Sequence, residues 1–397
     1  LLNRYVSYII KKIFLGSFIH TNEYGELIVV DRGMIHIENG KKLNDIKDKN
    51  VSVLKNNQFL IPGFIDCHIH AVQFPNLGVG YDKKLLEWLE HYTFPLEKKY
   101  IDEIFAEQVF NTVVKQTIIK GTTTACYFAS LYSRASVILG QIAINIGQRA
   151  FIGKISMNEK RNDNYYETTE ESSPLIKPII TPRFALSCDM TLMKELGNLA
   201  KQKNLHILIN SFNPEYSSYA AVYDNAGLLT NKTVLAHGIY LSDNEIALLN
   251  KRGAAVIHCP SSNTCLKSGL CDIQRLKSKG VKIGLGTDVS GGQSCSILDA
   301  MKSALQVSSH LSLIKDNYKA LDYKDVFHMA TLGGAAVAID NQIGNFEIGK
   351  EFDALVVDIN VNDGPLNTFR SSTLEEQLQK FIYCGDDRNI VEVYVRG

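Results

Sequence analysis

The sequence lacks an excess of either charge, and this absence narrows the kinds of partner it can have. Its 397 residues include 42 Lys plus Arg and 42 Asp plus Glu, so the formal charge is zero. Nucleic acids and anionic membranes attract strongly basic surfaces, which this composition does not favour. We therefore expect a small-molecule partner and no binding to nucleic acid or to a membrane.

Paired cysteines are missing as well. The eight cysteines contain no C-x-x-C pair, and most of them lie in apolar, strand-like stretches. Disulfide frameworks and zinc ribbons need paired cysteines, so we expect buried, reduced thiols and a cytoplasmic protein. The sequence shows no internal repeat or low-complexity tract, and its N-terminal apolar stretch is too short to span a membrane because Lys11 and Lys12 interrupt it.

What the sequence does contain is a series of apolar, β-branched runs separated by amphipathic segments. This alternation is typical of βα units around a parallel sheet. Eight runs in series predict an α/β fold with a closed (β/α)8 barrel of the TIM type. The runs cover residues 59–70, 122–129, 150–157, 178–188, 204–210, 233–241, 254–260 and 281–289.

The helices between the runs are clearest after the first and the sixth. Ser242 and Glu245 form a capping box ahead of the helix that follows the sixth run. Gly121 stands where a C-terminal cap would end the helix that follows the first. The apolar face of that earlier helix is predicted to comprise Ile101, Ile104, Phe105, Val109, Val113 and Ile118.

Two links between runs lack the helical pattern that such a barrel needs. The link after the third run is mostly the polar "NEKRNDNYYETTEESSP", and the link after the fifth run carries Pro214 with only a weak helical period. A crossover between parallel strands takes a dozen or more residues and is usually a full helix. Each link therefore marks a place where a helix is expected and not found.

The two ends of the chain read as short strands and turns outside the barrel. Residues 1–60 and 345–397 contain runs such as "ELIVVDRGMIHIENGK" and "EFDALVVDI", with turn signals at Asn39, Gly40, Gly349 and "GDDRN". Neither end can complete a sheet alone. We therefore predict that both ends meet in one small β domain beside a barrel of residues 61–344.

The stretch "IPGFIDCHIHA" (61–71) ends the first run with His68 and His70. Residues two apart on a strand share a face, and the C-terminal end of a barrel strand faces the functional site. Two imidazoles placed in this way can bind one zinc or iron ion. The pair alone is weak evidence, because two partly exposed histidines at a strand end would give the same pattern.

Two further strand ends strengthen the metal interpretation. His237 lies near the end of the sixth run, and Asp288 lies at the end of the eighth. Asp288 taken alone could equally cap a helix or a turn, since Gly291 and Gly292 follow it. A barrel would bring His68, His70, His237 and Asp288 together as a metal site with a carboxylate beside it.

The same motifs resemble a known family. "PGFIDCHIHA", "LAHG" and "GLGTDV" are similar to the amidohydrolase superfamily. Within it, the chain resembles the animal-type guanine deaminases from about residue 13 to its end. The stretches that carry this closer resemblance are "LLEWLEHYTFP", "GTTTACYFA", "TPRFALSC", "LLTNKTVLAHG", "HCPSSN" and "GDDRNIVEVYV".

The resemblance implies hydrolysis of the 2-amino group of guanine to give xanthine and ammonia, a reaction of purine catabolism. It implies one Zn²⁺ per chain, zinc being preferred to iron, bound by His68, His70 and Asp288. A bound metal would lower the pKa of its water to about 7. Asp288 would also take the proton of that water, while His237 would orient the water or the leaving amine. The family's habit of pairing implies a homodimer.

The family resemblance also implies which residues bind the substrate. The resemblance implies that Gln73 and Arg183 hydrogen-bond the polar edge of the purine, and that Phe184 and Trp88 supply aromatic surface. Trp88 could instead be a core residue at helical spacing. Arg183 precedes an apolar stretch, so its charge needs a partner, for which a purine carbonyl is one candidate.

The chain departs from the family pattern after the fifth run. A third metal histidine and a proton-shuttling glutamate, spaced as H-x-x-E, are expected after "LHI", yet the sequence reads "LHILINSFNPE". If the register continues without a gap, Asn210 and Asn213 occupy these places. An absent segment fits better, because "FNPEYSSYAAVYDNAGLLTNKT" resembles family sequence well beyond the H-x-x-E pair, and a second gap is expected before the fourth run. His206 is expected to lie too deep in the barrel to replace the histidine, and Glu215 is a speculative replacement for the acid.

Three functions remain open at this point. The first is guanine deamination. The second is a catalytically impaired relative that acts as a purine-binding or scaffolding protein, because the missing ligand and acid would weaken both metal affinity and proton transfer. The third, an amidohydrolase of another ring such as a triazine or pyrimidine, is disfavoured by Gln73, Arg183 and Phe184. A deaminase of the cytidine type is a poor match, because its H-x-E and P-C-x-x-C signature is missing.

Overall fold

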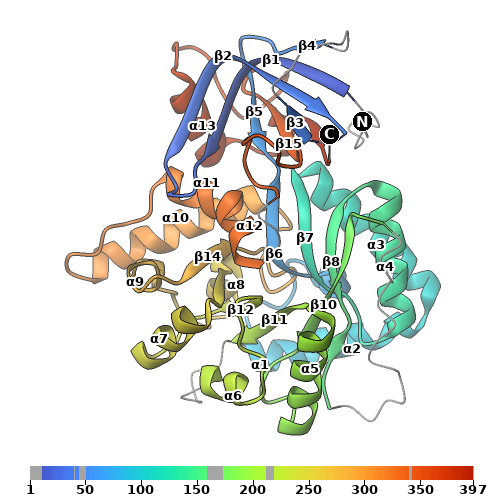
Figure 1. Cartoon of the computed structure of the whole chain (residues 1–397). Coiled ribbons are helices and arrows are strands. Elements are labelled where there is room, and N and C mark those ends of the chain that lie inside the picture. Colours follow the sequence, from blue (N-terminus) through green and yellow to red (C-terminus); the bar gives the residue numbers. More distant parts are fainter. Residues whose placement is uncertain are drawn as a thin grey trace.

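The computed structural model describes residues 11–39, 41–43, 51–158, 173–211, 219–338 and 342–396. The described chain forms two sheets, a barrel-like parallel sheet surrounded by helices and a smaller sheet packed at one end of it (Figure 1). This arrangement confirms the predicted fold class.

The parallel sheet contains all eight predicted strands in sequence order. A short additional strand, β9 (Ile155–Ser156), extends the pairing of β8 against β10. The eight barrel strands are β6 (Phe64–His70), β7 (Thr122–Phe128), β8 (Arg149–Gly153), β10 (Ile176–Pro182), β11 (His206–Ser211), β12 (Thr233–His237), β13 (Ala255–His258) and β14 (Lys282–Leu285).

The first and last strands of this sheet meet through the chain that follows β14. The backbone N–H of Asp288 donates to the carbonyl of His68 at 2.8 Å, and the N–H of His70 donates to the carbonyl of Val289 at 3.2 Å. Every residue of β6 and β7 is buried, as expected for strands covered on both faces. The closure therefore places the ends of β6 and β14 side by side.

Two of the predicted strands need correction. The run at residues 59–70 breaks at Gly63 into β5 (Gln58–Pro62), which joins the small sheet, and β6, which enters the barrel. Gly63 allows this close passage, because a Cβ there would lie 2.1 Å from Oγ1 of Thr123. The run at 178–188 ends as a strand at Pro182, so Arg183 and Phe184 lie in the loop that follows.

Helices cover the outside of the barrel (Figure 1). Between β6 and β7 come η1 (Ala71–Asn76), α1 (Leu85–Trp88), η2 (Leu89–Thr93), α2 (Phe94–Glu97), η3 (Lys98–Ile101) and α3 (Glu103–Ile119). The later helices are α4 (Ser133–Ile146), α5 (Met190–Lys203), α6 (Tyr219–Asn225), α7 (Asp243–Arg252), α8 (Pro260–Cys265), α9 (Ile273–Ser278), α10 (Ile297–Ile314), α11 (Tyr323–Ala330) and α12 (Leu332–Ala338).

The predicted helix signals are mostly correct. Ser242 and Glu245 form the capping box at the start of α7, and Gly121 adopts a φ of +86° just after α3. The predicted apolar face of α3 is wrong at its start. Ile101 precedes the helix and Ile104 is 70% exposed, because Asp102 caps the helix and sets its first turn in solvent.

The link after the third run falls almost wholly on residues 159–172, outside the described part of the chain. The link after the fifth run contains residues 212–218, which also lie outside it, and then α6, a helix of only seven residues. The described part of this link agrees with its weak helical period.

Both ends of the chain contribute to the small sheet, as predicted. Its order is β16-β15-β5-β1-β2-β3, and β4 also pairs with β1. The C-terminal flank also contains α13 (Leu374–Cys384) and η4 (Asp387–Asn389), so the prediction of only strands and turns there is wrong. The strands not yet placed are β1 (Lys11–Thr21), β2 (Leu27–Glu38), β3 (Lys41–Leu43), β4 (Val51–Val53), β15 (Ala354–Asp358) and β16 (Ile390–Tyr394).

The small sheet has its own apolar cluster, and a buried ion pair ties it to the barrel. Phe14, Phe352 and Tyr394 pack within that cluster. Arg149 at the start of β8 contacts Asp353, just before β15, through two hydrogen bonds of 3.1 Å, and Glu351 at 2.6 Å.

The split of the chain at residues 60 and 344 stays a prediction. Among the described helices, none is long and apolar enough to cross a membrane.

We predict that Arg149→Met destabilises the fold by about 3–5 kcal/mol, because it leaves the buried carboxylate of Asp353 without its cation. Urea unfolding followed by circular dichroism measures the effect. Arg134→Met is the matched control, since Arg134 pairs with Glu103 on the surface and should contribute about 0–1 kcal/mol. Equal losses of unfolding free energy in the two variants would contradict the expectation that the buried pair stabilises the fold more than the surface pair does.

Candidate metal centre and its pocket

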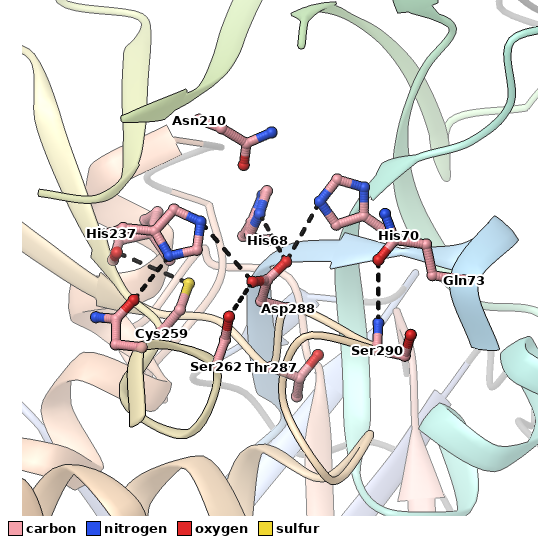
Figure 2. A network of polar contacts seen from close by, with 12 residues as sticks. His68, His70, Gln73, Asn210, His237, Cys259, Ser262, Thr287, Asp288 and Ser290 are labelled. Carbon is pink, nitrogen blue, oxygen red and sulfur yellow. Dashed lines mark hydrogen bonds and ion pairs between the residues drawn. The ribbon is translucent and has the colours of Figure 1, made fainter. Parts of the chain in front are cut away.

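Three side chains converge where the first and last barrel strands meet. Nε2 of His68 and Nε2 of His70 lie 3.1 and 3.3 Å from Oδ1 of Asp288 (Figure 2). All three residues are buried. Among the described residues, this is the group of three or more His, Cys, Asp or Glu side chains whose ligand atoms lie close enough to hold one metal ion.

The donor atoms fit a divalent metal. Ligand atoms that each lie about 2.0–2.2 Å from one zinc-like ion are roughly 3 Å apart. The two nitrogen–oxygen distances to Asp288 are 3.1 and 3.3 Å, and the ligand atoms of all three residues lie within 4.8 Å of one another. Among the described residues, Nδ1 of His68 and Nδ1 of His70 have no hydrogen-bond partner, while Nε2 of each ring faces Oδ1 of Asp288. Two imidazoles and one carboxylate make a donor set for a borderline divalent ion. The geometry therefore supports a divalent-metal site formed by these three residues.

Asp288 is held in its ionised form. Burial alone would raise the pKa of its carboxyl group, but the adjacent His68 and the hydrogen bonds from His68 and His70 hold that pKa well below its usual range. The hydroxyl of Ser262 donates to its Oδ2 at 2.5 Å. A carboxylate with this support can bind a cation or accept a proton at neutral pH.

His237 lies beside the same carboxylate, with Nε2 3.8 Å from Oδ2 of Asp288. Its Nδ1 lies 2.9 Å from Oδ1 of Asn263, an oxygen that can only accept, so Nδ1 carries the proton. Burial lowers the pKa of His237 to about 4, which keeps its ring neutral at pH 7. Nε2 of His237 thus faces the site with its lone pair.

Asp66 joins the two strands that carry the ligands. Its carboxylate accepts hydrogen bonds from the N–H of His68 at 3.2 Å, from the N–H of Thr287 at 3.1 Å and from the hydroxyl of Thr287 at 2.5 Å. The residue is fully buried, and burial raises its pKa to about 6. These contacts fix His68 and Asp288 relative to each other.

The four residues expected to bind substrate line one pocket together with His70 and Asp288. Trp88 lines the pocket and is also packed against Leu89 and Leu266, so its contact with a substrate stays a prediction. The lining includes Gln73, Trp88, Arg183, Phe184, His70, His237, Asn210 and Asp288.

The partner of Arg183 is a residue that the sequence did not reveal. Glu97 accepts from both terminal nitrogens of Arg183, at 2.5 and 3.0 Å, and the two side chains are buried. The same carboxylate accepts from Nε2 of Gln73 at 3.2 Å, and the ring of Phe94 lies 4.8 Å from the guanidinium. The charge of Arg183 is therefore already balanced, which removes one argument for a purine carbonyl as its partner.

Asn210 stands at the end of β11, where the family's third histidine is expected. β11 pairs in register with β10 and β12 and places Ser211 opposite His237, so the strand continues through Asn210 without interruption. Asn210 is 5% exposed, and its Oδ1 is buried with no hydrogen-bond partner in the described part of the chain. His206 lies at the other end of the strand, too far down to reach the site, as predicted. Asn213 and Glu215 lie outside the described residues.

Sequence reasoning missed three residues that complete the site. Ser262 and Asn263 follow β13 within "HCPSSN", a motif that signalled the family but gave no role to its members. Glu97 follows "LLEWLEHYTFP" by two residues. A charged residue in an otherwise apolar helical segment was the signal available for Glu97, and its partner Arg183 lies 86 positions further along the chain.

The chain belongs to the amidohydrolase family, whose family model matches residues 59–397. The fold and the metal residues described above agree with this assignment. Within the family it is similar to guanine deaminases. The mouse enzyme is 42% identical over 97% of this chain and 95% of its own length, and the Dictyostelium discoideum enzyme is 39% identical over 97% of both. The structure of guanine deaminase from C. acetobutylicum with bound guanine matches with a TM-score of 0.87 and 32% identity, covering 98% of this chain and 99% of that one.

The lengths of these alignments bear on the missing H-x-x-E pair. The alignment with the mouse enzyme spans 435 positions and the chain has 397 residues, so at least 38 positions of that enzyme have no counterpart here. This agrees with the expectation that segments of the family are absent from the chain. Their placement before the fourth strand and after the fifth stays a prediction.

We predict that the purified chain binds a divalent ion and that His68→Ala abolishes binding at stoichiometric metal, because a ligand is lost from a small donor set. The measurement is the rise of the thermal midpoint on adding Zn²⁺ to chelator-treated protein, since a ligand at about 100 times its Kd adds about 2.7 kcal/mol. His91→Ala is the control, because His91 is exposed on η2. A rise that persists in His68→Ala would contradict the site.

We also predict that Glu97→Gln destabilises the protein by about 3–5 kcal/mol, because Arg183 is then buried without a counter-charge. Adding Arg183→Met to this variant should recover part of the loss, since the two changes are coupled. Glu87→Gln, which removes an exposed partner of Lys83 in the same segment, serves as the control in chemical denaturation. If Glu97→Gln and Arg183→Met lower the free energy of unfolding by strictly additive amounts, the two residues are not coupled.

Proposed function

We propose that the chain is a metal-dependent hydrolase that converts guanine and water to xanthine and ammonia. The observation that carries this function is the 42% identity to guanine deaminases across 97% of the chain. The pocket supports it, since His70 and Asp288 line the same cavity as the substrate-binding residues expected from the family. The alternative of a catalytically impaired purine-binding or scaffolding protein is not favoured.

The reaction replaces one bond at C2 of the purine. A water oxygen adds to C2 and the bond from C2 to the exocyclic nitrogen breaks. One proton of the water leaves with ammonia, the other ends on the ring nitrogen N3, and C2 becomes a carbonyl. When bound, a divalent ion supplies a water whose pKa is lowered to about 7. The remaining work of orienting the ring and moving the proton falls to the side chains of the pocket.

Asp288 is the proton carrier in this proposal. Its carboxyl group has a pKa well below the usual range, so it is ionised at neutral pH and can accept the proton of the attacking water. Ser262 occupies its Oδ2, which leaves Oδ1 on the side of His68 and His70. His237, neutral and protonated on Nδ1, presents Nε2 to orient the water or the leaving amine.

Arg183 and Gln73 donate hydrogen bonds to the polar edge of the base. A guanidinium has five N–H donors, and Glu97 uses one on each terminal nitrogen, so the other three can serve a carbonyl or ring nitrogen of the substrate. Gln73 keeps one amide hydrogen, because its Oε1 accepts from the N–H of Ser290 and its other hydrogen goes to Glu97. Phe184 and Trp88 offer the aromatic surface, and such stacking stabilises a bound base by about 1–3 kcal/mol.

Zinc is the ion we assign to the site, at one per chain. Two imidazoles and a carboxylate suit zinc, and a catalytic zinc site keeps an open position for water. The expected homodimer, the cytoplasmic location and the role in purine catabolism belong to the same proposal and rest on the family resemblance. Light scattering on the purified chain tests the dimer.

The decisive test is guanine turnover by the purified chain with zinc supplied, followed as loss of guanine absorbance and appearance of xanthine. We predict turnover by the wild-type chain and a loss of at least about 10²-fold in Asp288→Asn, which cannot take the proton. Asp243→Asn is the control, since Asp243 pairs with Arg275 on the surface. A folded, zinc-loaded chain without turnover would overturn the enzymatic assignment in favour of a non-catalytic relative.

A further inference from the structure

We propose that the side-chain oxygen of Asn210 is a fourth protein ligand of the metal, taking the place of the imidazole expected at the end of the fifth barrel strand. This inference rests on the proposed metal-dependent function. It concerns a ligand that differs in kind from the family pattern, a neutral carboxamide oxygen in place of a ring nitrogen.

The orientation of the Asn210 carboxamide follows from its hydrogen bonds. One hydrogen bond of 2.9 Å joins Nδ2 of Asn210 to the carbonyl oxygen of Arg183. A carbonyl oxygen cannot donate, so the amide nitrogen must face Arg183 and the amide oxygen must face the other way. That direction is the interior of the pocket, where Figure 2 shows Oδ1 turned toward the group of His68, His70 and His237.

The position of this oxygen is fixed by the backbone. The N–H of Asn210 donates to the carbonyl of Arg183 at 3.3 Å, and its own carbonyl accepts from the hydroxyl of Tyr223 at 3.3 Å. Asn210 also pairs with Ala236 of β12. It is therefore held by Arg183, Tyr223 and β12, while its Oδ1 has no hydrogen-bond partner among the described residues.

A metal is the partner that the surroundings favour for this oxygen. An unpartnered carbonyl oxygen accepts a proton or binds a cation. The nearby rings belong to His68 and His70, and Nε2 of both faces the same carboxylate oxygen of Asp288, at 3.1 and 3.3 Å. One cation would satisfy the oxygen and the nitrogens together, with Asp288 supplying the charge.

The change of ligand has consequences for selectivity. Carboxamide and imidazole are both neutral, so the substitution leaves the net charge of the site unchanged. An oxygen donor is harder than an imidazole and suits Mn²⁺ or Mg²⁺ better than a nitrogen donor does. We therefore expect weaker binding of Zn²⁺ than a three-histidine site would give, and a smaller preference for Zn²⁺ over Mn²⁺.

The experiment measures metal affinity without turnover. Chelator-treated protein competes with a chromophoric chelator for Zn²⁺ and for Mn²⁺, and the Co²⁺-loaded protein is examined by visible absorption, which reports the ligands. The variants are Asn210→Ala and Asn210→His, with His68→Ala as a positive control. Asn145→Ala is the matched control, because Asn145 lies on α4, where its side chain pairs only with Gln141.

We expect Asn210→Ala to weaken Zn²⁺ binding by at least about tenfold and Asn210→His to strengthen it by a similar factor and to raise the ratio of Zn²⁺ to Mn²⁺ affinity. Both should shift the Co²⁺ absorption bands, and Asn145→Ala should leave them unchanged. If Asn210→Ala does not fold, the histidine variant carries the test through its gain of affinity and its spectrum.

The results that would contradict this inference alone differ from those that would also contradict the proposed function. If Asn210→Ala and Asn210→His both bind metal as the wild type does while His68→Ala binds weakly, Asn210 is not a ligand and the proposed function stands. If His68→Ala also binds metal as the wild type does, the metal site itself is misplaced, and the proposed function fails together with this inference.

Discussion

The closure of the barrel is the constraint on which the rest of the molecule depends. β6 and the chain after β14 are separated by more than two hundred residues, yet the N–H of Asp288 bonds to the carbonyl of His68, and buried Asp66 bonds to both strands. A buried carboxylate is costly unless its oxygens are satisfied, so the three hydrogen bonds to Asp66 fix a single register for the two strand ends. That register brings His68, His70 and Asp288 within reach of one ion.

A second buried carboxylate organises the other half of the pocket. Glu97 comes from the short helices after β6 and contacts Arg183 from the loop after β10 and Gln73 from η1. Since the guanidinium and the amide share one carboxylate, their remaining donors are fixed relative to each other. A similar buried pair, Arg149 with Asp353, fixes the small sheet to the barrel. Charged groups thus set the geometry, while apolar packing supplies most of the driving force.

The fifth strand shows how a local change propagates to chemistry. Asn210 pairs with Ala236 of β12 and its N–H donates to the carbonyl of Arg183, so the strand continues through this position without a break in the sheet. What changes is a single donor atom facing the pocket. A buried oxygen without a partner costs about 1–3 kcal/mol, which a bound cation would remove. The site can therefore keep its shape while its affinity for a particular ion is altered.

The sequence by itself determined the eight barrel strands, the β domain built from both ends, and the positions of His68, His70, His237 and Asp288, because apolar periodicity and strand-end placement are local properties. The sequence did not determine the helix α13, the break at Gly63 or the exposure of Ile104. The break depends on the close passage of Thr123, and the exposure depends on the cap that Asp102 gives α3. Only the tertiary structure decided that Glu97 balances Arg183, that Ser262 supports Asp288, and that the oxygen of Asn210 faces the pocket. Each depends on which distant side chain lies within about 3 Å, and a linear pattern carries no record of that distance.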